Sequence, residues 1–381
     1  MSQPAAAKDG VTIGMAVAFS GWMEAYDGEA AKMAQLWVEQ KNAKGGLLGA
    51  PIKVVTADTK TDRVQGAKAG QDLIQQGAEL LLVSADYDYG APAALQAQKA
   101  GKISVFLGAS DPKAGVLGVG PLSFTANNAA QLEGAVMGEW GYDKKGYRKG
   151  YMLIDQMIEY NKSICAGYEW AFPKKGGKIE GQDTFNGQDA TISSQITRLS
   201  NAIRTKAVDS IMLCSTNPGA ASAVRQMRAA GITLPILSGT AMDGLYWVNS
   251  VPGLKDFYLP VQALTVNDPR PAVNEITAAY EKKYGKLPTT QYAYPIYAFL
   301  DLWAKAVTEV GSTDGAKVVA VMNKYDNEPT VLGPRTFTPK LHIQISEPMT
   351  VVSYADGKET PVEEWKIKDV IPNPVLYRLK K

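Results

Sequence analysis

The sequence predicts an α/β fold of two doubly wound lobes, each with a parallel sheet covered by helices. The first observation is a strand–helix–strand unit between Val11 and Asp58. The second is that the alternation of short apolar runs and helical segments restarts after Ala129 and continues to Val261. Strands that alternate with helices form parallel sheets, because each helix returns the chain to the same edge. A chain of 381 residues is long for one domain and comfortable for two.

Hydrophobic pattern defines the opening unit. The apolar run from Val11 to Phe19 is too short to span a membrane and is typical of a strand buried on both faces. Apolar residues at helical spacing predict a helix over residues 28–43. Gly45 and Gly46 end this helix, because glycine adopts the left-handed conformation of a helix end at no cost. A second apolar run, residues 52–57, completes the unit.

The same patterns predict the remaining elements in order. Further strands of the first lobe are expected at residues 78–83, 103–107 and 121–126, after a helix at 62–76. The second series has strands at 150–154, 178–185, 209–214, 235–238 and 257–261, with helices at 129–140, 163–172, 190–205 and 219–230. Helices then follow at 271–284, 292–310 and 316–325. Residues 343–354 and 370–377 have β character, with a hairpin signal at Asp356-Gly357.

Composition excludes several classes of protein. Lys plus Arg number 40 and Asp plus Glu 38, and this near-balance argues against a nucleic-acid binder with a broad basic face. No apolar run approaches the roughly 18 residues of a membrane-spanning helix. The first ten residues lack the charged and apolar regions of a signal peptide. If the protein is exported, we therefore expect its signal peptide to have been removed from this sequence.

Motifs for catalysis or cofactor binding are weak. Two cysteines, Cys165 and Cys214, are too few for a metal site or a disulfide framework, and they favour two buried free thiols over a single bridge. The one histidine, His342, is interpreted as a packed or solvated residue rather than a catalyst. Gly115 to Gly120 misses the dinucleotide fingerprint, and neither a Walker A motif nor a G-x-S-x-G elbow is present. We expect no cofactor, no metal and no enzymatic activity.

Polar loops follow the predicted strands and are the candidate binding segments. In parallel α/β sheets, ligands bind beyond the carboxyl ends of the strands, and free N–H groups at the following helix starts favour a carboxylate. The hydroxyls of Ser20, Ser84 and Ser110 add donors there. The alternative is that such residues are ordinary helix caps. The loops are residues 20–26, 84–89, 108–111, 155–161 (which ends at Asn161), 214–217 and 239–243.

The run N-A-K-G-G-L-L-G-A-P-I-K-V from Asn42, after a strand and Ser20-Gly21, resembles the leucine/isoleucine/valine-binding branch of periplasmic solute-binding proteins with the type I fold. The resemblance implies a periplasmic receptor of an ABC importer, which closes its two lobes on a small ligand and delivers it to a membrane permease. It also implies a monomer whose chain crosses between lobes three times. We place the crossings near Ala126, Gln262 and Leu332. Lobe 1 is then 1–126 plus 263–331, and lobe 2 is 127–262 plus 332–381.

The resemblance also assigns site residues. In the first lobe it implies that groups after the third and fourth strands hold a ligand carboxylate, with a bulky residue after the first strand. In the second lobe it implies a tyrosine after the first strand and the loop after the third, with an aromatic contact from a late helix. The matching residues are Tyr87, Asp88, Ala109, Ser110 and Trp22 in the first lobe, Tyr160, Ser215 and Asn217 in the second, and Tyr292 or Tyr294 from the helix.

One departure from the family concerns the ligand's ammonium group. Amino-acid binders of this branch pair it with an acid, but the resemblance matches that position to Lys255, which is followed by Asp256. Asp86, Asp88 and Asp243 are the alternative partners, unless they cap helices or face water. Abundant tyrosine and tryptophan suit an aromatic or apolar carboxylate as well as a branched-chain amino acid.

Two other classes of function stay open. One is a cytosolic ligand sensor of the same bilobal fold that acts through a protein partner. The other is an α/β enzyme, which needs a catalytic group that the sequence does not locate.

Overall fold

The computed structural model describes residues 10–379, which form two compact units. The first unit runs to Asn127 and adds Pro269–Pro288 and Tyr292–Ile343, and the second contains the remaining segments, including Thr289–Gln291. The first change of unit lies next to the expected crossing at Ala126, whereas the others fall later than Gln262 and Leu332. That these units are the lobes of a receptor stays a prediction. Residues 1–9, on which the expectation of a removed signal peptide rests, lie outside the described residues, as do 380–381.

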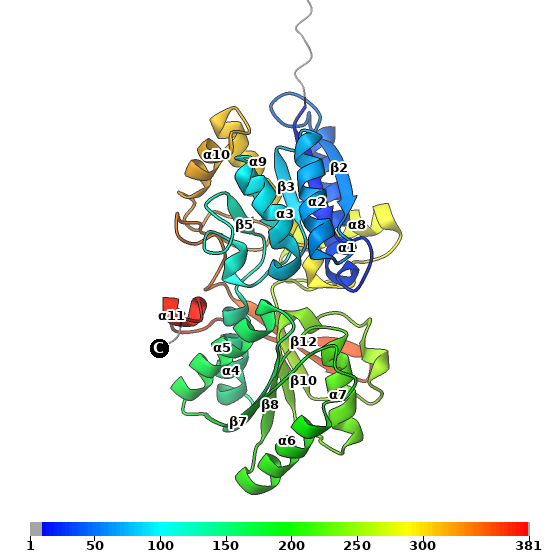
Figure 1. Cartoon of the computed structure of the whole chain (residues 1–381), viewed down its shortest axis with the longest axis vertical. Helices are drawn as coiled ribbons and strands as arrows, with labels where there is room; N and C mark the ends of the chain where they lie inside the picture. Colours follow the sequence, from blue (N-terminus) through cyan, green and yellow to red (C-terminus); the bar gives the residue numbers. More distant parts are fainter. Residues whose placement is uncertain (1–9, 380–381) are drawn as a thin grey trace, which may run out of the picture. The chain divides into compact units, whose positions relative to one another are not determined.

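The first unit is built on a five-stranded sheet in which every strand runs parallel to its neighbours (Figure 1). Ile13 of β1, which lies between β2 and β3, pairs with Val54 on one side and Leu80 on the other. The predicted doubly wound α/β fold is therefore confirmed. In sheet order the strands are β2 (Lys53–Asp58), β1 (Thr12–Val17), β3 (Leu80–Val83), β4 (Ile103–Phe106) and β5 (Ser123–Thr125).

The helices of the first unit begin close to the strand ends. The predicted loop at residues 84–89 is in part helical, because the side chain of Asp86 caps α3 by accepting a hydrogen bond from Asp88 N at 2.8 Å. Tyr87, Asp88 and Tyr89 therefore form the first turn of a helix. The helices are α1 (Glu24–Ala43), α2 (Arg63–Gln75), α3 (Tyr87–Lys99), η1 (Pro112–Ala114), α8 (Pro271–Tyr284), α9 (Pro295–Val310) and α10 (Gly315–Met322), with η4 (Gln291–Ala293) before α9.

The second unit has a seven-stranded mixed sheet. Five strands are parallel to their neighbours, and β11 and β12 add an antiparallel hairpin at the β10 edge. The hairpin turns at Asp356 and Gly357, as predicted, and both have positive φ. In sheet order the strands are β12 (Lys358–Trp365), β11 (Met349–Ala355), β10 (Phe257–Val261), β9 (Ile236–Ser238), β8 (Ser210–Cys214), β6 (Lys149–Asp155) and β7 (Lys178–Phe185).

Two predictions for this unit are wrong in detail. The β character expected for residues 370–377 is replaced by the short helix α11 (Asn373–Leu376), because Pro372 and Pro374 lack the N–H groups that a strand needs and suit a helix start. The expected loop at 155–161 ends early, since α5 already begins at Glu159. The other helices are α4 (Ala130–Asp143), α5 (Glu159–Lys174), α6 (Ser193–Lys206), α7 (Gly219–Ala229), η2 (Thr240–Met242) and η3 (Val248–Ser250).

Among residues 10–379, no helix has the length and apolar character needed to cross a membrane.

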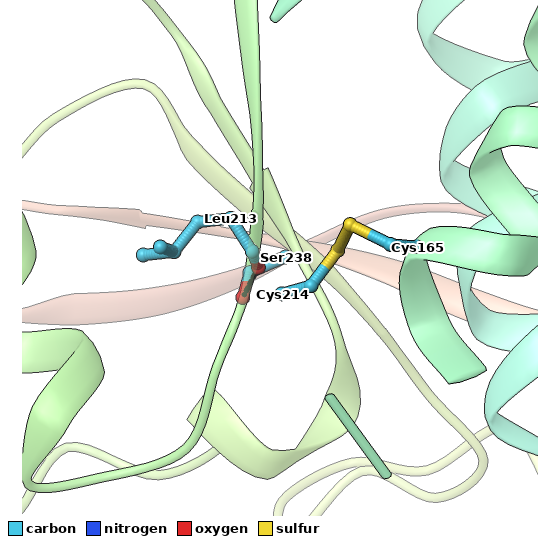
Figure 2. Close-up of a disulfide and its surroundings, with 4 residues drawn as sticks. All are labelled: Cys165, Leu213, Cys214 and Ser238. Carbon is cyan, nitrogen blue, oxygen red and sulfur yellow. Dashed lines mark hydrogen bonds between the residues drawn. A yellow bond between two sulfur atoms is a disulfide. The ribbon is translucent and has the colours of Figure 1, made fainter. Parts of the chain in front are cut away.

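A disulfide joins Cys165 on α5 to Cys214 at the end of β8 (Figure 2). The expectation of two free thiols is therefore wrong. Because α5 packs on β8, residues that are 49 positions apart in sequence come to a Cα–Cα distance of 5.8 Å. Next to the bridge, the Ser238 hydroxyl donates to the Leu213 carbonyl at 2.8 Å. The end of β8 is thus held both by α5 and by the neighbouring strand.

His342 is packed inside the first unit, in agreement with its interpretation as a packed or solvated residue. Its ring lies flat against Phe124 at 3.8 Å between centroids. Its nitrogens lie 2.7 Å from the Ser123 carbonyl and from Asn323 Oδ1. Burial lowers the pKa of His342 to about 4, so the ring is neutral at physiological pH.

We expect the Cys165–Cys214 bridge to stabilise the second unit by about 2 to 4 kcal/mol, since it restricts the unfolded chain. Urea denaturation measures the free energy of unfolding of the oxidised protein and of the double variant Cys165→Ala/Cys214→Ala. A second series repeats both measurements with reductant. Only the oxidised wild type should lose stability on reduction. Two thiols that react with iodoacetamide in the denatured, unreduced protein would contradict the bridge.

Candidate functional site

The carboxyl edge of the first unit's sheet is held together by a buried carboxylate. Asp27 of α1 accepts hydrogen bonds from Ala18 N, just after β1, and from Ala85 N, just after β3, each at 2.7 Å. Burial raises the pKa of Asp27 to about 6, although these bonds and the nearby Ser84 hydroxyl oppose the shift. Ser84 itself is fully buried. Sequence analysis missed Asp27, because an aspartate inside a helix is normally a solvated residue.

Ser110, after β4, is held in place by hydrogen bonds, but its own hydroxyl donates only a weak one. The Asn127 amide donates to Ser110 Oγ at 2.9 Å and to the Gly108 carbonyl at 2.8 Å. The Ser110 hydroxyl reaches the Gly108 carbonyl only at 3.5 Å, a long hydrogen bond. The carbonyl of Ala109 accepts the Thr125 hydroxyl. Ser110 therefore offers a positioned hydroxyl donor at a strand end.

Aromatic rings form a continuous row beside these hydroxyls. Trp22 meets Tyr89 edge-to-face at 5.3 Å and Tyr26 at 6.2 Å, and Tyr26 meets Tyr292 at 5.4 Å. A Cβ on Gly108 would lie 2.4 Å from the Tyr292 ring, so the row lies directly against the loop that carries Ser110. We call these four residues, Tyr89, Trp22, Tyr26 and Tyr292, the aromatic row. Such rings provide an apolar wall with phenol groups for hydrogen bonding.

Of the two alternatives in the late helix, Tyr292 belongs to the aromatic row, and its role as a site residue stays a prediction. Tyr294 is fully buried, and its hydroxyl lies 2.7 Å from Thr277 Oγ1 of α8. This bond holds α9 against α8 in the interior of the first unit.

Several other candidates of the first unit have structural partners. Exposed Ser20 donates to Asp58 at 2.7 Å, and Tyr87 stacks on Phe106. Asp88 pairs with Arg63 at 3.1 Å. Asp86 caps α3, and burial, followed by the charge of Asp88, raises its pKa well above the ordinary value. These contacts favour the helix-cap interpretation of Asp86 over a role as an ammonium partner.

Glu133 organises the carboxyl edge of the second unit. Tyr160 donates its hydroxyl to Glu133 Oε2 at 2.6 Å and accepts a bond from Ala241 N at 2.9 Å. Thr240 N also donates to Glu133 Oε2, at 2.9 Å. The loops after β6 and β9 are thereby connected through one carboxylate. Sequence analysis missed Glu133, although an acid inside the otherwise apolar run of α4 is a signal that could have identified it.

The loop after β8 is fixed by two further polar contacts. Ser215 donates its hydroxyl to Asp155 Oδ2 at 2.8 Å, at the end of the adjacent strand β6. Asn217 precedes a cis peptide bond to Pro218 and donates from its amide to Tyr246 at 3.2 Å. Burial raises the pKa of Asp155.

Asp243 lies in a network of donors. It accepts bonds from the Thr290 hydroxyl at 2.9 Å, from the Tyr354 hydroxyl at 3.2 Å and from Gln291 N. Burial, together with the charge of Glu359, raises its pKa well above the ordinary value. Asp243 therefore holds the 289–291 segment in the second unit and does not have the environment of a charged ammonium partner.

Asn161, in the first turn of α5, is different from these residues. It is completely buried, and neither amide atom has a hydrogen-bond partner among the described residues. The Thr216 hydroxyl is also buried without a hydrogen-bond partner among the described residues; it lies in the predicted loop 214–217 but was not singled out from the sequence. Within residues 10–379, no cluster of three or more His, Cys, Asp or Glu side chains is arranged to hold a metal ion.

The chain belongs to the periplasmic binding protein family, whose model matches residues 10–359. The family consists of solute-binding receptors. Among curated relatives, the Leu/Ile/Val-binding protein homolog 3 of Brucella melitensis is 21% identical over 93% of this chain and 94% of its own length. The Leu/Ile/Val-binding protein BraC3 of Rhizobium johnstonii is 22% identical over 86% of this chain and 87% of its own. The predicted family resemblance is confirmed.

Solved structures have the same fold. The branched-chain amino acid binding protein LivJ of Streptococcus pneumoniae, in complex with isoleucine, has a TM-score of 0.83 at 23% identity and covers 94% of this chain and 100% of its own. A solute-binding protein of R. palustris in complex with 4-hydroxybenzoate has a TM-score of 0.81 at 16% identity. The match covers 94% of this chain and 97% of that protein's chain. Another solute-binding protein of R. palustris, in complex with benzoate, has a TM-score of 0.76 at 17% identity. This match covers 95% of this chain and 98% of that protein's chain.

The raised pKa of Asp27 predicts a pH dependence of stability. The unfolded chain releases this proton near pH 3.8 and the folded chain near pH 6, so the free energy of unfolding falls as pH rises between these values. The fall due to Asp27 should be about 3 kcal/mol. Asp27→Asn does not titrate, so the unfolding free energy of the wild type minus that of the variant should fall by about 3 kcal/mol between pH 4 and pH 7. A difference that is constant across this range, measured by chemical denaturation, would contradict the assignment.

Proposed function

We propose that this protein is an extracytoplasmic receptor of an ABC importer and that it captures a small carboxylate. The observation that carries the proposal is the arrangement in the first unit, where the Ser110 hydroxyl stands beside the aromatic row at the carboxyl ends of parallel strands. A hydroxyl donor and helix starts hold a carboxylate, while an aromatic wall accommodates an apolar or aromatic group. The ligands named for the solved relatives, isoleucine, benzoate and 4-hydroxybenzoate, combine these two features.

The ligand site, in this proposal, is completed by residues of the second unit. Tyr160, Ser215, Asn217 and Asn161 follow the strands β6 and β8 at the equivalent edge of their own sheet. Lobe closure on the ligand is the mode of capture that the family membership supports. The partner is then the membrane permease of the importer, and the receptor acts as a monomer without catalysis.

The disulfide supports an extracytoplasmic location over a cytosolic sensor. Disulfides form and persist in oxidising compartments and are rare in the cytosol, where thiols are kept reduced. Cys165 and Cys214 are both buried, and their bridge joins two of the segments that carry candidate site residues. A cytosolic sensor would be expected to hold these cysteines as thiols.

Calorimetric titration with benzoate, 4-hydroxybenzoate, L-leucine and L-isoleucine tests the ligand class. We expect one-to-one binding of at least one of these carboxylates. Ser110→Ala should weaken it about tenfold, which is the effect of losing one hydrogen bond to a charged group. Ser194→Ala, on the exposed face of α6, is the matched control and should bind as the wild type does. Absence of binding to all four compounds, or Ser110→Ala binding equal to the wild type, would count against the proposal.

A further inference from the structure

We propose that the second unit's part of the ligand site recognises a hydroxyl group on the ligand through Asn161 and Thr216. This inference rests on the proposed function and makes it more specific. The preferred ligand class is then a carboxylate that carries a hydroxyl group at a distance from the carboxylate and needs no ammonium group. The argument depends on three observations: where these two residues lie, what their polar atoms contact, and which acids are available around them.

The disulfide joins the two segments that carry Asn161 and Thr216. Asn161 lies four residues before Cys165, on the same face of α5 and about 6 Å nearer the carboxyl edge of the sheet. Thr216 lies two residues beyond Cys214, in the loop that follows the carboxyl end of β8. Both residues therefore belong to segments at the carboxyl edge of the sheet, beyond the bridge. The start of α5, which contains Asn161, has no side-chain cap.

The polar atoms of these two residues have unused hydrogen-bonding capacity. Asn161 is 0% and Thr216 is 3% exposed, and Asn161 Nδ2, Asn161 Oδ1 and Thr216 Oγ1 lack partners among the described residues. Buried polar groups without partners destabilise a fold, and proteins retain few of them. A hydroxyl suits this pair because it donates one hydrogen bond and accepts two, whereas the pair offers both donors and acceptors.

The acids at this edge are already engaged. Glu133 accepts hydrogen bonds from the Tyr160 hydroxyl and from Thr240 N. Asp155 accepts hydrogen bonds from the Ser215 hydroxyl, Met157 N and Gly187 N. Asp243 accepts hydrogen bonds from the Thr290 hydroxyl, the Tyr354 hydroxyl and Gln291 N. Each of these carboxylates thus accepts at least two hydrogen bonds from groups of the second unit. Asn161 and Thr216, by contrast, are neutral, and their polar side-chain atoms lack hydrogen-bond partners among the described residues. Neutral groups discriminate a ligand hydroxyl from hydrogen, because loss of the hydroxyl leaves them unpaired in the complex.

The test compares two ligands that differ by one hydroxyl, 4-hydroxybenzoate and benzoate, by calorimetric titration. Wild type should bind 4-hydroxybenzoate at least about tenfold more tightly than benzoate. Thr216→Val, which replaces the hydroxyl by a methyl of similar shape, and Asn161→Ala should each remove most of this preference, because they weaken the binding of 4-hydroxybenzoate more than that of benzoate. Asn201→Ala, on the exposed side of α6, is the control and should keep the full preference.

Thermal unfolding of the ligand-free variants separates a binding role from a structural one. If Asn161 and Thr216 serve the ligand, their replacement removes unpaired buried groups, so the melting temperature should stay or rise. A lower melting temperature with an unchanged ligand preference would assign them to the fold and overturn the inference. Equal wild-type affinity for the two benzoates, or binding of L-leucine alone, would also overturn it while the receptor function stands. Absence of binding to any carboxylate would remove the proposed function as well.

Discussion

The structure depends on the constraint that parallel strands end at one edge of their sheet. Each helix returns the chain to the opposite edge, so the loops that follow the strands collect at the carboxyl edge, whatever their separation in sequence. In the first unit this brings Ala18, Ala85 and Ser110 together from three different loops. In the second unit it does the same for Tyr160, Ser215 and Thr240. The candidate site is a direct consequence of this topology.

Buried carboxylates then fix the loops that the topology brings together. Asp27 in the first unit, and Glu133 and Asp155 in the second, each accept hydrogen bonds from more than one loop or strand end. A buried carboxylate is costly unless donors surround it, so each of these acids constrains the backbone N–H groups around it. The disulfide adds a covalent connection between α5 and β8. Asn161 and Thr216 differ from these acids, because the amide atoms of Asn161 and the hydroxyl of Thr216 are buried without a hydrogen-bond partner among the described residues.

Sequence predicted the architecture well because hydrophobic periodicity is a local signal. The helix expected at 271–284 has those bounds in the structure, and the hairpin at Asp356-Gly357 is present. Pairings across long sequence separations could not be predicted: nothing in the sequence places Cys165 beside Cys214. The same limit explains the missed roles of Asp27 and Glu133, whose partners come from distant loops. The prolines that convert residues 370–377 into a helix were a local signal that outweighs β propensity.

Assignment of the protein as a receptor for a carboxylate is tested most directly by native mass spectrometry of the protein purified without denaturation from cells grown on mixed organic acids. The account predicts one small molecule per chain, released unchanged on unfolding, whose fragmentation identifies a carboxylic acid. A bound molecule without a carboxyl group, or an added carboxylate that is chemically converted during incubation, would contradict the account.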